Sequence, residues 1–526
     1  MPGETLVRTG PLCHRGEVFR LLGLLGALSL GTDLGSGSPL DESLRRSVVA
    51  TRFATALGCP GDQVSDVLYA SLLQHLGCTA YAHENGQRWG DDTAFVRLAF
   101  GTDFSDNRDV WRTFVTGLAE SSGRSRVGVL ATTLTTARKD ATLGPTATCE
   151  VTRQAAGRLG LSDTVQVALV HALAQWDGRG YPDVRGEQIP RATRLVHVAS
   201  VAVQTDAEAG RDAVVPELRR RSGTVLDPAL VHVFVERAGD LMDTGDADPF
   251  DLALQSEPDP VRWVDVPGVR EVSRTFGDLA DLKSPWFQGH SGAVGELAAS
   301  AAAGLGLGEA EVETVRVAGY LHDLGRIGTP SSIWDKPGTL TRSELEQTRL
   351  HPQLSERILS RVPALAEAGA LAGQHHERLD GSGYFRGLGG AHLSVASRVL
   401  ATADAYRRLV EDRAHRPGTA PARAAERLRA EARAGALDGD VVEAVLHAAG
   451  HGTASRGARP AGLTARQVEV LRLVAAGQSN RQIARSLSIS PRTAEHHVQD
   501  TYLKIGCSTR AGAALFAMEH GLLKDG

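Results

Sequence analysis

Apolar residues recur at helical spacing along most of the chain. Between Glu309 and Leu324 they fall on one helical face, and Gly325 follows as a natural helix stop. The same spacing marks another helix from Val395 to Leu409. No region is rich in the alternation of apolar and polar positions that is typical of β-strands. The pattern therefore predicts an all-α protein.

This helical pattern occurs twice. A shift of 248 positions aligns the N-terminal part with the central part without a gap, so that Asp33 meets Asp281 and Leu76 meets Leu324. A shift of 203 positions then aligns D-G-R-G-Y at 177–181 with D-G-S-G-Y at 380–384. A long collinear match of this kind predicts two copies of one helical domain.

Three segments lie outside the repeat. Residues 101–145 have no counterpart in the second copy, and their Gly, Ser and Thr content predicts loops with short elements. The charged segment 206–260 is expected to be a helical connector between the copies. The composition of 451–462 is that of a flexible linker.

Length and cysteine content narrow the class of protein. A chain of 526 residues is too long for one core and predicts roughly three domains. The five cysteines are dispersed without a C-x-x-C pair, which argues for a reducing compartment. The apolar segment 21–31 resembles a signal-peptide core, but it is too short to span a membrane. The repeat places it on 269–279 as an internal helix. We therefore expect a cytoplasmic protein without a membrane segment.

Charge is distributed unevenly along the chain. The whole sequence holds 57 basic and 62 acidic residues, a net charge of −5. Residues 461–526 hold eight basic and five acidic residues, so this tail carries +3 and the rest carries −8. A small basic tail on an acidic body suggests a local contact with nucleic acid.

The central copy carries an ordered set of imidazoles and carboxylates. Such ligands suit iron, manganese or zinc, and two divalent ions would neutralise a phosphodiester and activate water beside it. A carboxylate next to a histidine can bridge two ions, and Asp323 follows His322 directly. A protein that binds metals only for stability is the alternative. The seven candidate ligands are His290, His322, Asp323, His351, His375, His376 and Asp404.

The first copy acts as an internal comparison, because the aligned positions have lost the set. One glutamate and one histidine remain, which is too few for a two-metal site. The aligned residues are Glu42, Gln74, His75, Thr148, Ala172, Leu173 and Ser200.

The H-D, H-H-E and D-G-S-G-Y motifs of the central copy resemble those of the HD-GYP family of metal-dependent phosphohydrolases. The resemblance covers about 278–416 and implies cleavage of a cyclic dinucleotide such as cyclic-di-GMP. It implies one metal ion on His290, His322, Asp323 and Asp404. It implies a second on His351, His375 and His376, with Asp323 bridging. It also implies contacts with substrate phosphates from Arg326, Arg413 and Arg416.

The copy departs from the family at four positions. Phe385 replaces the proline of G-Y-P, Arg326 the lysine of H-D-x-G-K, and Arg407 the second aspartate of A-D-x-x-D-A. Trp286 stands where three-metal members carry a glutamate, so we expect two metal ions rather than three. The metal set stays whole, but the choice of substrate is left open.

The tail predicts a helix-turn-helix. Thr464 and Gln467 form a capping-box pattern, Gly477 ends the first helix and Ser479 begins the second. A third helix begins at Pro491.

The segment from Leu463 to Leu523 resembles the LuxR-type DNA-binding domain. The resemblance implies phosphate contacts from Arg492, Thr493 and Lys504. It implies base-facing positions at Glu495, His496 and Gln499, and a dimerising fourth helix at 509–518. An interaction module that never meets DNA is the alternative.

Together these features predict an all-α chain of two HD-type domains and a four-helix helix-turn-helix domain. The first copy is expected to be degenerate. We expect a homodimeric transcriptional regulator that binds double-stranded DNA and hydrolyses a cyclic dinucleotide or related phosphodiester with two divalent ions. The alternative is a metal-containing nucleotide sensor without turnover. The expected segments are 1–205 (degenerate copy), 206–265 (connector), 266–450 (phosphohydrolase), 451–462 (linker) and 463–526 (helix-turn-helix).

Overall fold

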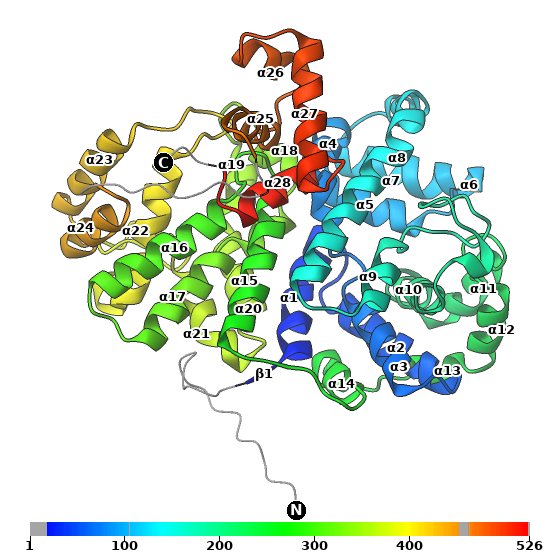
Figure 1. The fold of residues 1–526 in the computed structure, drawn as a ribbon. Helices are drawn as coiled ribbons and strands as arrows, with labels where there is room; N and C mark the ends of the chain where they lie inside the picture. Colours follow the sequence, from blue (N-terminus) through cyan, green and yellow to red (C-terminus); the bar gives the residue numbers. More distant parts are fainter. Residues whose placement is uncertain (1–17, 105, 452–460, 462, 524–526) are drawn as a thin grey trace, which may run out of the picture. The chain divides into compact units, whose positions relative to one another are not determined.

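The computed structural model describes residues 18–104, 106–451, 461 and 463–523 (Figure 1). In this part of the chain nearly all regular structure is helical, which confirms the predicted all-α class. The one sheet joins two strands of two residues each, β1 (Phe19–Arg20) and β2 (Trp263–Val264). No described helix is both long enough and apolar enough to cross a membrane.

The chain divides into two compact units. The first unit is Arg20–Trp263 together with Pro330–Ser332, and the second is Val264–Thr329 together with the chain from Ile333 onward and the residues before Arg20. The helices of the first unit are α1 (Leu21–Gly35), α2 (Glu42–Ala56), α3 (Gly61–Leu72), η1 (Cys78–Tyr81), α4 (Ala82–Trp89), α5 (Asp92–Gly101), α6 (Asn107–Asp109), η2 (Val110–Val115), α7 (Thr116–Ser122), α8 (Arg126–Arg158), α9 (Asp163–Val170), η3 (Gly186–Gln188), α10 (Arg191–Ala209), α11 (Arg211–Arg221), α12 (Pro228–Glu236), α13 (Ala238–Met242) and α14 (Pro249–Gln255).

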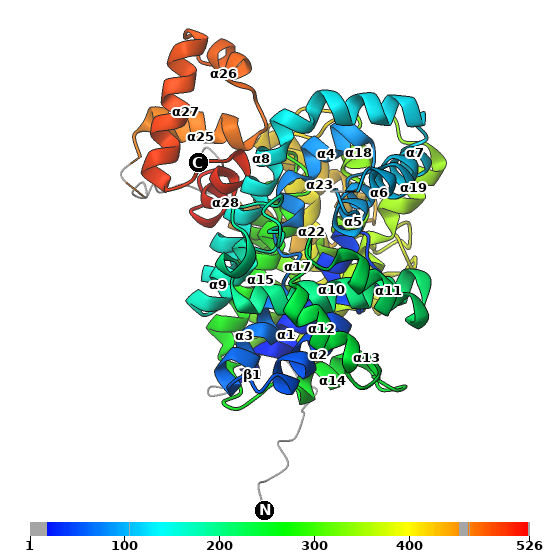
Figure 2. The ribbon, with the colours of Figure 1, turned by 90° about the vertical axis from the view of Figure 1, so that its right-hand side faces the viewer.

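Figure 2 gives a second view of the ribbon. The second unit contains the candidate ligands and the C-terminal helices. Its helices are α15 (Val266–Asp281), α16 (His290–Gly304), α17 (Glu309–Leu321), η4 (Leu324–Gly328), α18 (Ser331–Trp334, which begins in the first unit), α19 (Arg342–Arg349), α20 (His351–Leu359), α21 (Pro363–Gly373), η5 (Gly390–His392), α22 (Val395–Val410), α23 (Pro421–Arg433), α24 (Gly439–Ala448), α25 (Ala465–Ala475), α26 (Asn480–Ser486), α27 (Pro491–Ile505) and α28 (Arg510–Glu519).

Helices of the two units correspond along the sequence. A shift of 248 positions converts the bounds of α2 into those of α16, and α3 begins where α17 begins. The start of each of α2 and α16 is fixed in the same way. The Asp33 carboxylate accepts from the Ser43 backbone N–H at 3.2 Å, and the Asp281 carboxylate accepts from that of Ser291 at 2.9 Å. The apolar segment 21–31 lies within the buried helix α1, which confirms that it is an internal helix.

The short elements expected in 101–145 are present as α6, η2 and α7, but the expectation is wrong for the end of this segment. From Arg126 the chain forms α8, whose start is capped because the Ser125 hydroxyl accepts from the Gly128 N–H at 3.1 Å. The helix was missed because Gly and Thr dilute its apolar positions. Its Val129 nevertheless packs in a small core with residues that precede the helix. This small cluster is Trp89, Phe114, Val115, Leu118, Ala119 and Val129.

The segment expected as a connector is helical, but much of it packs as part of the first unit. The Asp227 carboxylate caps α12 and pairs with Arg194 at 2.8 Å. In the second unit Asp438 caps α24 and pairs with Arg398 at 3.0 Å. Helix α12 therefore has a structural counterpart in α24. The linker expected at 451–462 lies almost wholly outside the described residues.

Candidate metal centre and nucleic-acid-binding face

The seven candidate ligands come from five separate places and meet in the interior of the second unit. His290 and His351 are the first residues of α16 and α20, and Asp404 lies within α22. His322 and Asp323 follow α17, and His375 and His376 follow α21. All seven side chains are at most 3% exposed. Three overlapping groups of them have ligand atoms within 4.8 Å of one another.

Asp323 lies between two sets of histidines. Its Oδ2 is 3.4 Å from His290 Nε2 and 2.9 Å from His322 Nε2. Its Oδ1 is 3.3 Å from His351 Nε2 and 3.6 Å from His375 Nε2. Each carboxylate oxygen thus faces a different pair of imidazoles, the arrangement that a bridging ligand requires.

Asp404 lies close to a histidine of each set. Its Oδ1 lies 3.3 Å from His290 Nε2, and its Oδ2 lies 3.4 Å from His376 Nδ1. The groups with metal-compatible spacing include His290, His322 and Asp404 on one side. On the other side they include His351, His375 and His376.

Hydrogen bonds fix which imidazole nitrogens are free to bind an ion. The Nδ1 atoms of His322, His351 and His375 lie 2.7, 2.5 and 2.5 Å from backbone carbonyl oxygens. A carbonyl only accepts, so each Nδ1 must carry the proton and each Nε2 presents a lone pair. The Nε2 atoms of His351 and His375 then face each other at 3.1 Å. Two neutral acceptors at that distance repel unless a cation or proton lies between them.

Several buried polar atoms of the centre have no hydrogen-bond partner among the described residues. Buried polar groups are normally satisfied, so a cluster of such atoms indicates a bound ion or water. Hard carboxylate oxygens and imidazole nitrogens are the donors that iron, manganese and zinc accept, and the residues therefore fit divalent metal ions. The atoms are His290 Nε2, His322 Nε2 and both carboxylate oxygens of Asp323 and of Asp404.

The electrostatics of the centre favour the metal-binding protonation states of Asp323, Asp404, His375 and His376. Burial opposes ionisation of Asp323, but Arg326 and His322 hold the pKa of its carboxyl well below the usual range. Asp404 is likewise buried, and Arg408 and His290 hold its pKa low. Burial lowers the pKa of His375 and His376 well below the usual value, so both imidazoles are neutral.

Arg326, predicted to contact substrate, lies inside the protein. It is 5% exposed, its Nη1 is 2.5 Å from Asp323 Oδ2, and its guanidinium lies 4.5 Å from the Phe287 ring centroid. These contacts put its positive charge beside the bridging carboxylate.

Arg413 and Arg416 have partners within the chain. Arg413 donates to the Trp286 carbonyl at 2.5 Å and to Glu411 Oε2 at 3.1 Å. Arg416 donates to several backbone carbonyls, among them that of Arg408. Their contact with substrate phosphates stays a prediction.

Arg408 was missed in the sequence. Its side chain is 40% exposed, and its Nη1 lies 3.5 Å from Asp404 Oδ2 and 3.1 Å from His376 Nδ1. It thus connects the buried centre with solvent. Its spacing of four residues from Asp404 on a helix was the available signal, because residues i and i+4 share a face.

A buried glutamate organises the loop after the paired histidines. The Glu377 carboxylate accepts from the backbone N–H groups of Arg386 and Leu388 at 2.8 and 2.9 Å. Gly383 lies so close to this turn that a Cβ atom there would be 2.4 Å from Glu377 Cα. The loop places the Tyr384 ring 4.7 Å from the His376 ring.

The aligned positions of the first unit form no such centre. The groups of potential ligands found in the described chain all lie in the second unit. Beside Glu42 stands the fully buried Arg46, which donates to the Ser71 carbonyl at 2.9 Å and lies 3.5 Å from Glu42 Oε1. The cavities at Gln74 and at His75 are each about 10 Å³, room for about one water.

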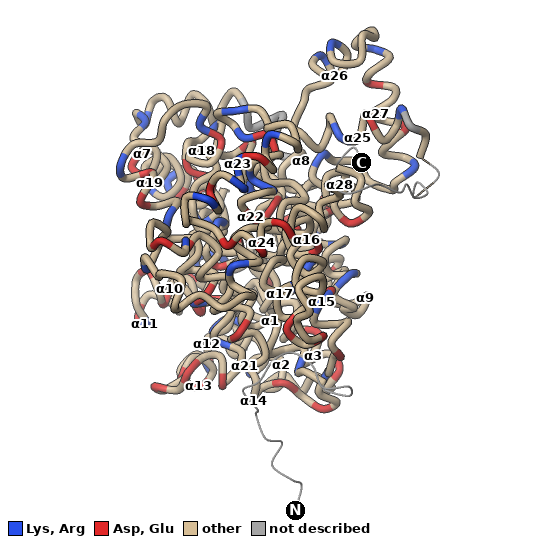
Figure 3. Tube along the Cα trace, turned by 90° about the vertical axis from the view of Figure 1, so that its left-hand side faces the viewer, with Lys and Arg blue, Asp and Glu red and all other residues tan. Residues whose placement is uncertain are grey.

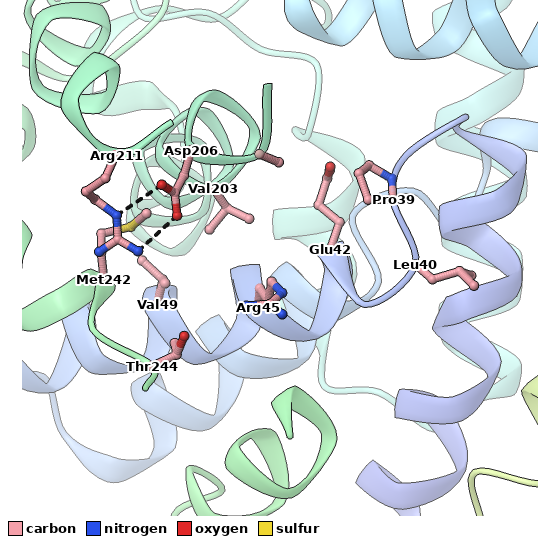
Figure 4. A pocket seen from close by; sticks show the side chains of 11 residues that line it. Pro39, Leu40, Glu42, Arg45, Val49, Val203, Asp206, Arg211, Met242 and Thr244 are labelled. Carbon is pink, nitrogen blue, oxygen red and sulfur yellow. Dashed lines mark hydrogen bonds and ion pairs between the residues drawn. The ribbon is translucent and has the colours of Figure 1, made fainter. Parts of the chain in front are cut away.

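Glu42 also lines a larger cavity of about 260 Å³ (Figure 4). Its wall is mostly apolar, with Val49, Val203 and Met242 among the lining residues. Two of its charged lining residues pair with each other, because the Arg211 guanidinium donates to the Asp206 carboxylate at 3.1 and 2.9 Å. The cavity gathers no set of metal ligands.

The predicted helix-turn-helix is present as α25 to α28. The capping box is formed, because Thr464 Oγ1 accepts from the Gln467 N–H at 3.2 Å and Gln467 Oε1 accepts from that of Thr464 at 3.0 Å. A second capping box joins Ser479 and Gln482 at the start of α26. A shared core holds the helices together, formed by Leu463, Val468, Val470, Leu471, Val474, Ile483, Ala484, Ala494, Val498, Ala513, Ala517 and Leu522.

The predicted DNA-contacting residues are exposed along α27, and α26 carries further basic residues (Figure 3). His496 is held by Asp500 at 2.9 Å, and Lys504 donates to Gln467 Oε1 at 2.9 Å. The remaining residues of this face are Arg492, Thr493, Glu495 and Gln499.

Known families match the two functional regions. Residues 274–441 match the HD domain, and residues 461–517 match the bacterial regulatory proteins of the luxR family. These matches confirm both family resemblances. The chain therefore contains an HD domain and, C-terminal to it, a domain of the luxR family.

Its relatives are named as phosphodiesterases of cyclic dinucleotides. The 3′3′-cGAMP-specific phosphodiesterase 3 of Vibrio cholerae is 28% identical over 408 residues, which are 76% of this chain and 88% of that protein. The cyclic di-GMP phosphodiesterase of Thermotoga maritima is 36% identical over 148 residues, 28% of this chain and 40% of that protein. A solved cyclic GMP-AMP-specific phosphodiesterase of V. cholerae shares the fold, with a TM-score of 0.55 at 22% identity over 82% of this chain and 98% of that one.

Proposed function

We propose that the second unit is a two-metal phosphodiesterase that hydrolyses a cyclic dinucleotide, and that the LuxR-family domain makes the chain a DNA-binding transcriptional regulator. The observation that carries the proposal is the buried centre, in which unpartnered imidazole nitrogens and carboxylate oxygens converge around Asp323. The named activities of the relatives support a cyclic dinucleotide as substrate.

In this proposal His290, His322 and Asp404 hold one divalent ion. His351, His375 and His376 hold the other, and Asp323 contacts both. Two bound ions of iron, manganese or zinc supply charge neutralisation and an activated water to a phosphodiester. Arg326 balances the charge of Asp323 from within, at 2.5 Å.

Arg408 is the residue that we assign to the substrate phosphate. A guanidinium pairs well with phosphate oxygens because it offers several N–H donors in one plane. The Arg408 side chain is 40% exposed and still reaches Asp404. A phosphate bound there lies at the edge of the metal centre.

The first unit is, in this proposal, a copy of the same fold that has lost its metals. The matching bounds of α2 and α16 support common descent, and Arg46 supplies a fixed positive charge beside Glu42. We assign it no hydrolysis.

The test measures product formation by the full-length protein. Purified protein loaded with Mn²⁺ or Fe²⁺ is incubated with 3′3′-cGAMP and with cyclic-di-GMP, and linear products are separated by chromatography. We expect turnover of at least one substrate and none by His322→Ala. If fully loaded protein binds the nucleotide but forms no product, the centre is a sensor rather than an enzyme. DNA binding is tested separately, by retention of promoter fragments at increasing salt.

A further inference from the structure

The carboxylate of Glu411 is the hydrogen-bond partner of one candidate metal ligand. Glu411 Oε2 lies 2.7 Å from His290 Nδ1. Glu411 follows the last residue of α22, and His290 begins α16, so the contact joins two helix ends that are 121 residues apart in sequence. The Glu411 side chain is 13% exposed and therefore lies mostly inside the protein.

His290 differs in this respect from three other histidines of the centre. His322, His351 and His375 each direct Nδ1 to the carbonyl three residues earlier in the chain. For His290 that carbonyl belongs to Phe287, and it accepts from the backbone N–H of His290 itself at 2.8 Å. The imidazole therefore takes its acceptor from elsewhere in the fold, and Glu411 supplies it.

Two arginines hold Glu411 in place. Arg407, four residues earlier on α22, donates to Glu411 Oε1 at 3.0 Å. Arg413 donates to Glu411 Oε2 at 3.1 Å and also to the Trp286 carbonyl at 2.5 Å, and its guanidinium lies 5.3 Å from the Phe287 ring centroid. The carboxylate is thus fixed from both sides and tied to the segment that leads into His290.

We propose that Glu411, held by Arg407 and Arg413, is a positioning residue that orients His290 for metal binding. The inference rests on the proposed two-metal function. A carboxylate on Nδ1 fixes the ring so that its Nε2 faces Asp323 and Asp404, at 3.4 and 3.3 Å. It also makes the imidazole a stronger donor to a cation, as such partners do in metal sites generally.

The proposal also explains one departure from the family pattern. An arginine at 407 in place of an aspartate acquires its role through Glu411, because the two residues lie one helical turn apart. Arg413 acts on His290 through the same carboxylate.

The test compares metal binding by Glu411→Gln and by a matched control, Glu443→Gln. The control removes the same charge from another arginine-paired glutamate of the second unit, one that pairs with Arg429 at 2.6 Å on the surface. Mn²⁺ affinity is measured by titration of metal-free full-length protein, and metal content by elemental analysis. The Co²⁺ form gives an absorption spectrum that reports the ligand field.

We expect Glu411→Gln to weaken Mn²⁺ binding at one of the two sites by about 10- to 100-fold, the usual effect of losing such a partner. Its Co²⁺ spectrum should change, and excess metal should restore most of kcat. Glu443→Gln should match the wild type, and Glu411→Asp, which keeps the charge, should fall between. Wild-type affinity and an unchanged Co²⁺ spectrum in folded Glu411→Gln would overturn the proposal. If Glu411→Gln does not fold, wild-type affinity and spectrum in Glu411→Asp overturn it equally, because the shorter side chain cannot hold the same contact.

The two proposals fail in different ways. Wild-type protein that binds two ions without hydrolysing any dinucleotide contradicts the enzymatic function and leaves the Glu411 measurement decisive. Wild-type protein that binds no metal contradicts both.

Discussion

Replacing Asp323 with asparagine should remove both metal ions, whereas the same change at Asp404 should affect one more than the other. Asp323 directs one oxygen to each side of the centre, at 2.9 Å from His322 Nε2 and 3.3 Å from His351 Nε2. An amide keeps one oxygen as a ligand and replaces the other with an N–H₂ group that cannot bind a cation. One side of the centre therefore loses a ligand, and both sides lose a negative charge.

The size of the effect follows from the same distances. An ion held between Asp323 and these nitrogens lies within about 4 Å of the carboxylate. A pair of unit charges at about 4 Å contributes about 4 kcal/mol at an effective dielectric constant of about 20. The metal is divalent, so this value is a lower estimate for each ion. Since about 1.4 kcal/mol corresponds to a tenfold change, affinity should fall at least about 1,000-fold at both sites.

The assay is metal titration of metal-free protein by calorimetry, with elemental analysis of the dialysed samples. Gel filtration and circular dichroism establish that Asp323→Asn and Asp404→Asn are folded. Gln74→Ala, at the position of the first unit that aligns with His322, serves as a control and should bind metal as the wild type does. The reasoning is refuted if Asp323→Asn keeps either ion at wild-type affinity.

Four further changes have defined outcomes. His322→Ala should abolish hydrolysis, whereas Gln74→Ala should leave kcat within about twofold, as measured by product chromatography. Gly383→Ala would place a Cβ atom 2.4 Å from Glu377 Cα and should destabilise the second unit by about 1–3 kcal/mol, as measured by urea unfolding. Gly338 has open space around it, so Gly338→Ala should reduce the free energy of unfolding by less than about 0.5 kcal/mol. Arg492→Ala should weaken binding to promoter DNA and reduce the slope of log affinity against log salt by about 0.9, measured by fluorescence anisotropy; an unchanged slope would mean that Arg492 meets no phosphate. Burial raises the pKa of the Asp33 carboxyl from 3.8 to about 7, so the folded state keeps a proton that the unfolded chain releases. The stability that this group contributes is full below about pH 4 and is lost as pH rises through about 7. Asp33→Asn should therefore reduce the difference in Tm between about pH 5 and pH 8.

The sequence was sufficient to identify the candidate metal ligands because each lies in a short motif and the motifs occur in a fixed order. It also predicted α17 and α22 from apolar spacing, and the capping box at Thr464 from two residues. These features are local. Each depends on residues within a few positions of one another, and such local patterns can be recognised in a single sequence.

The partners of those ligands could not be predicted in the same way. Glu411 contacts His290 across 121 positions, and nothing near either residue indicates the pairing. Arg413 was assigned to substrate from its motif, but its donors reach Glu411 and the Trp286 carbonyl. The outer contacts of a site depend on where helix ends meet, and tertiary packing alone determines this.

The two units also show how one helical frame can balance buried charge in two ways. In the first, the fully buried guanidinium of Arg46 lies 3.5 Å from Glu42, so the chain itself supplies the cation. In the second, the position aligned with Arg46 is Val294, and two buried carboxylates face five imidazoles instead of one arginine. The positive charges of Arg326 and Arg408 offset part of the negative charge of these carboxylates. The oxygens of Asp323 and Asp404 nevertheless have no hydrogen-bond partner among the described residues. A cation from outside the chain would satisfy those oxygens and the facing nitrogens together, and on this ground we assign metal binding to the second unit and not to the first.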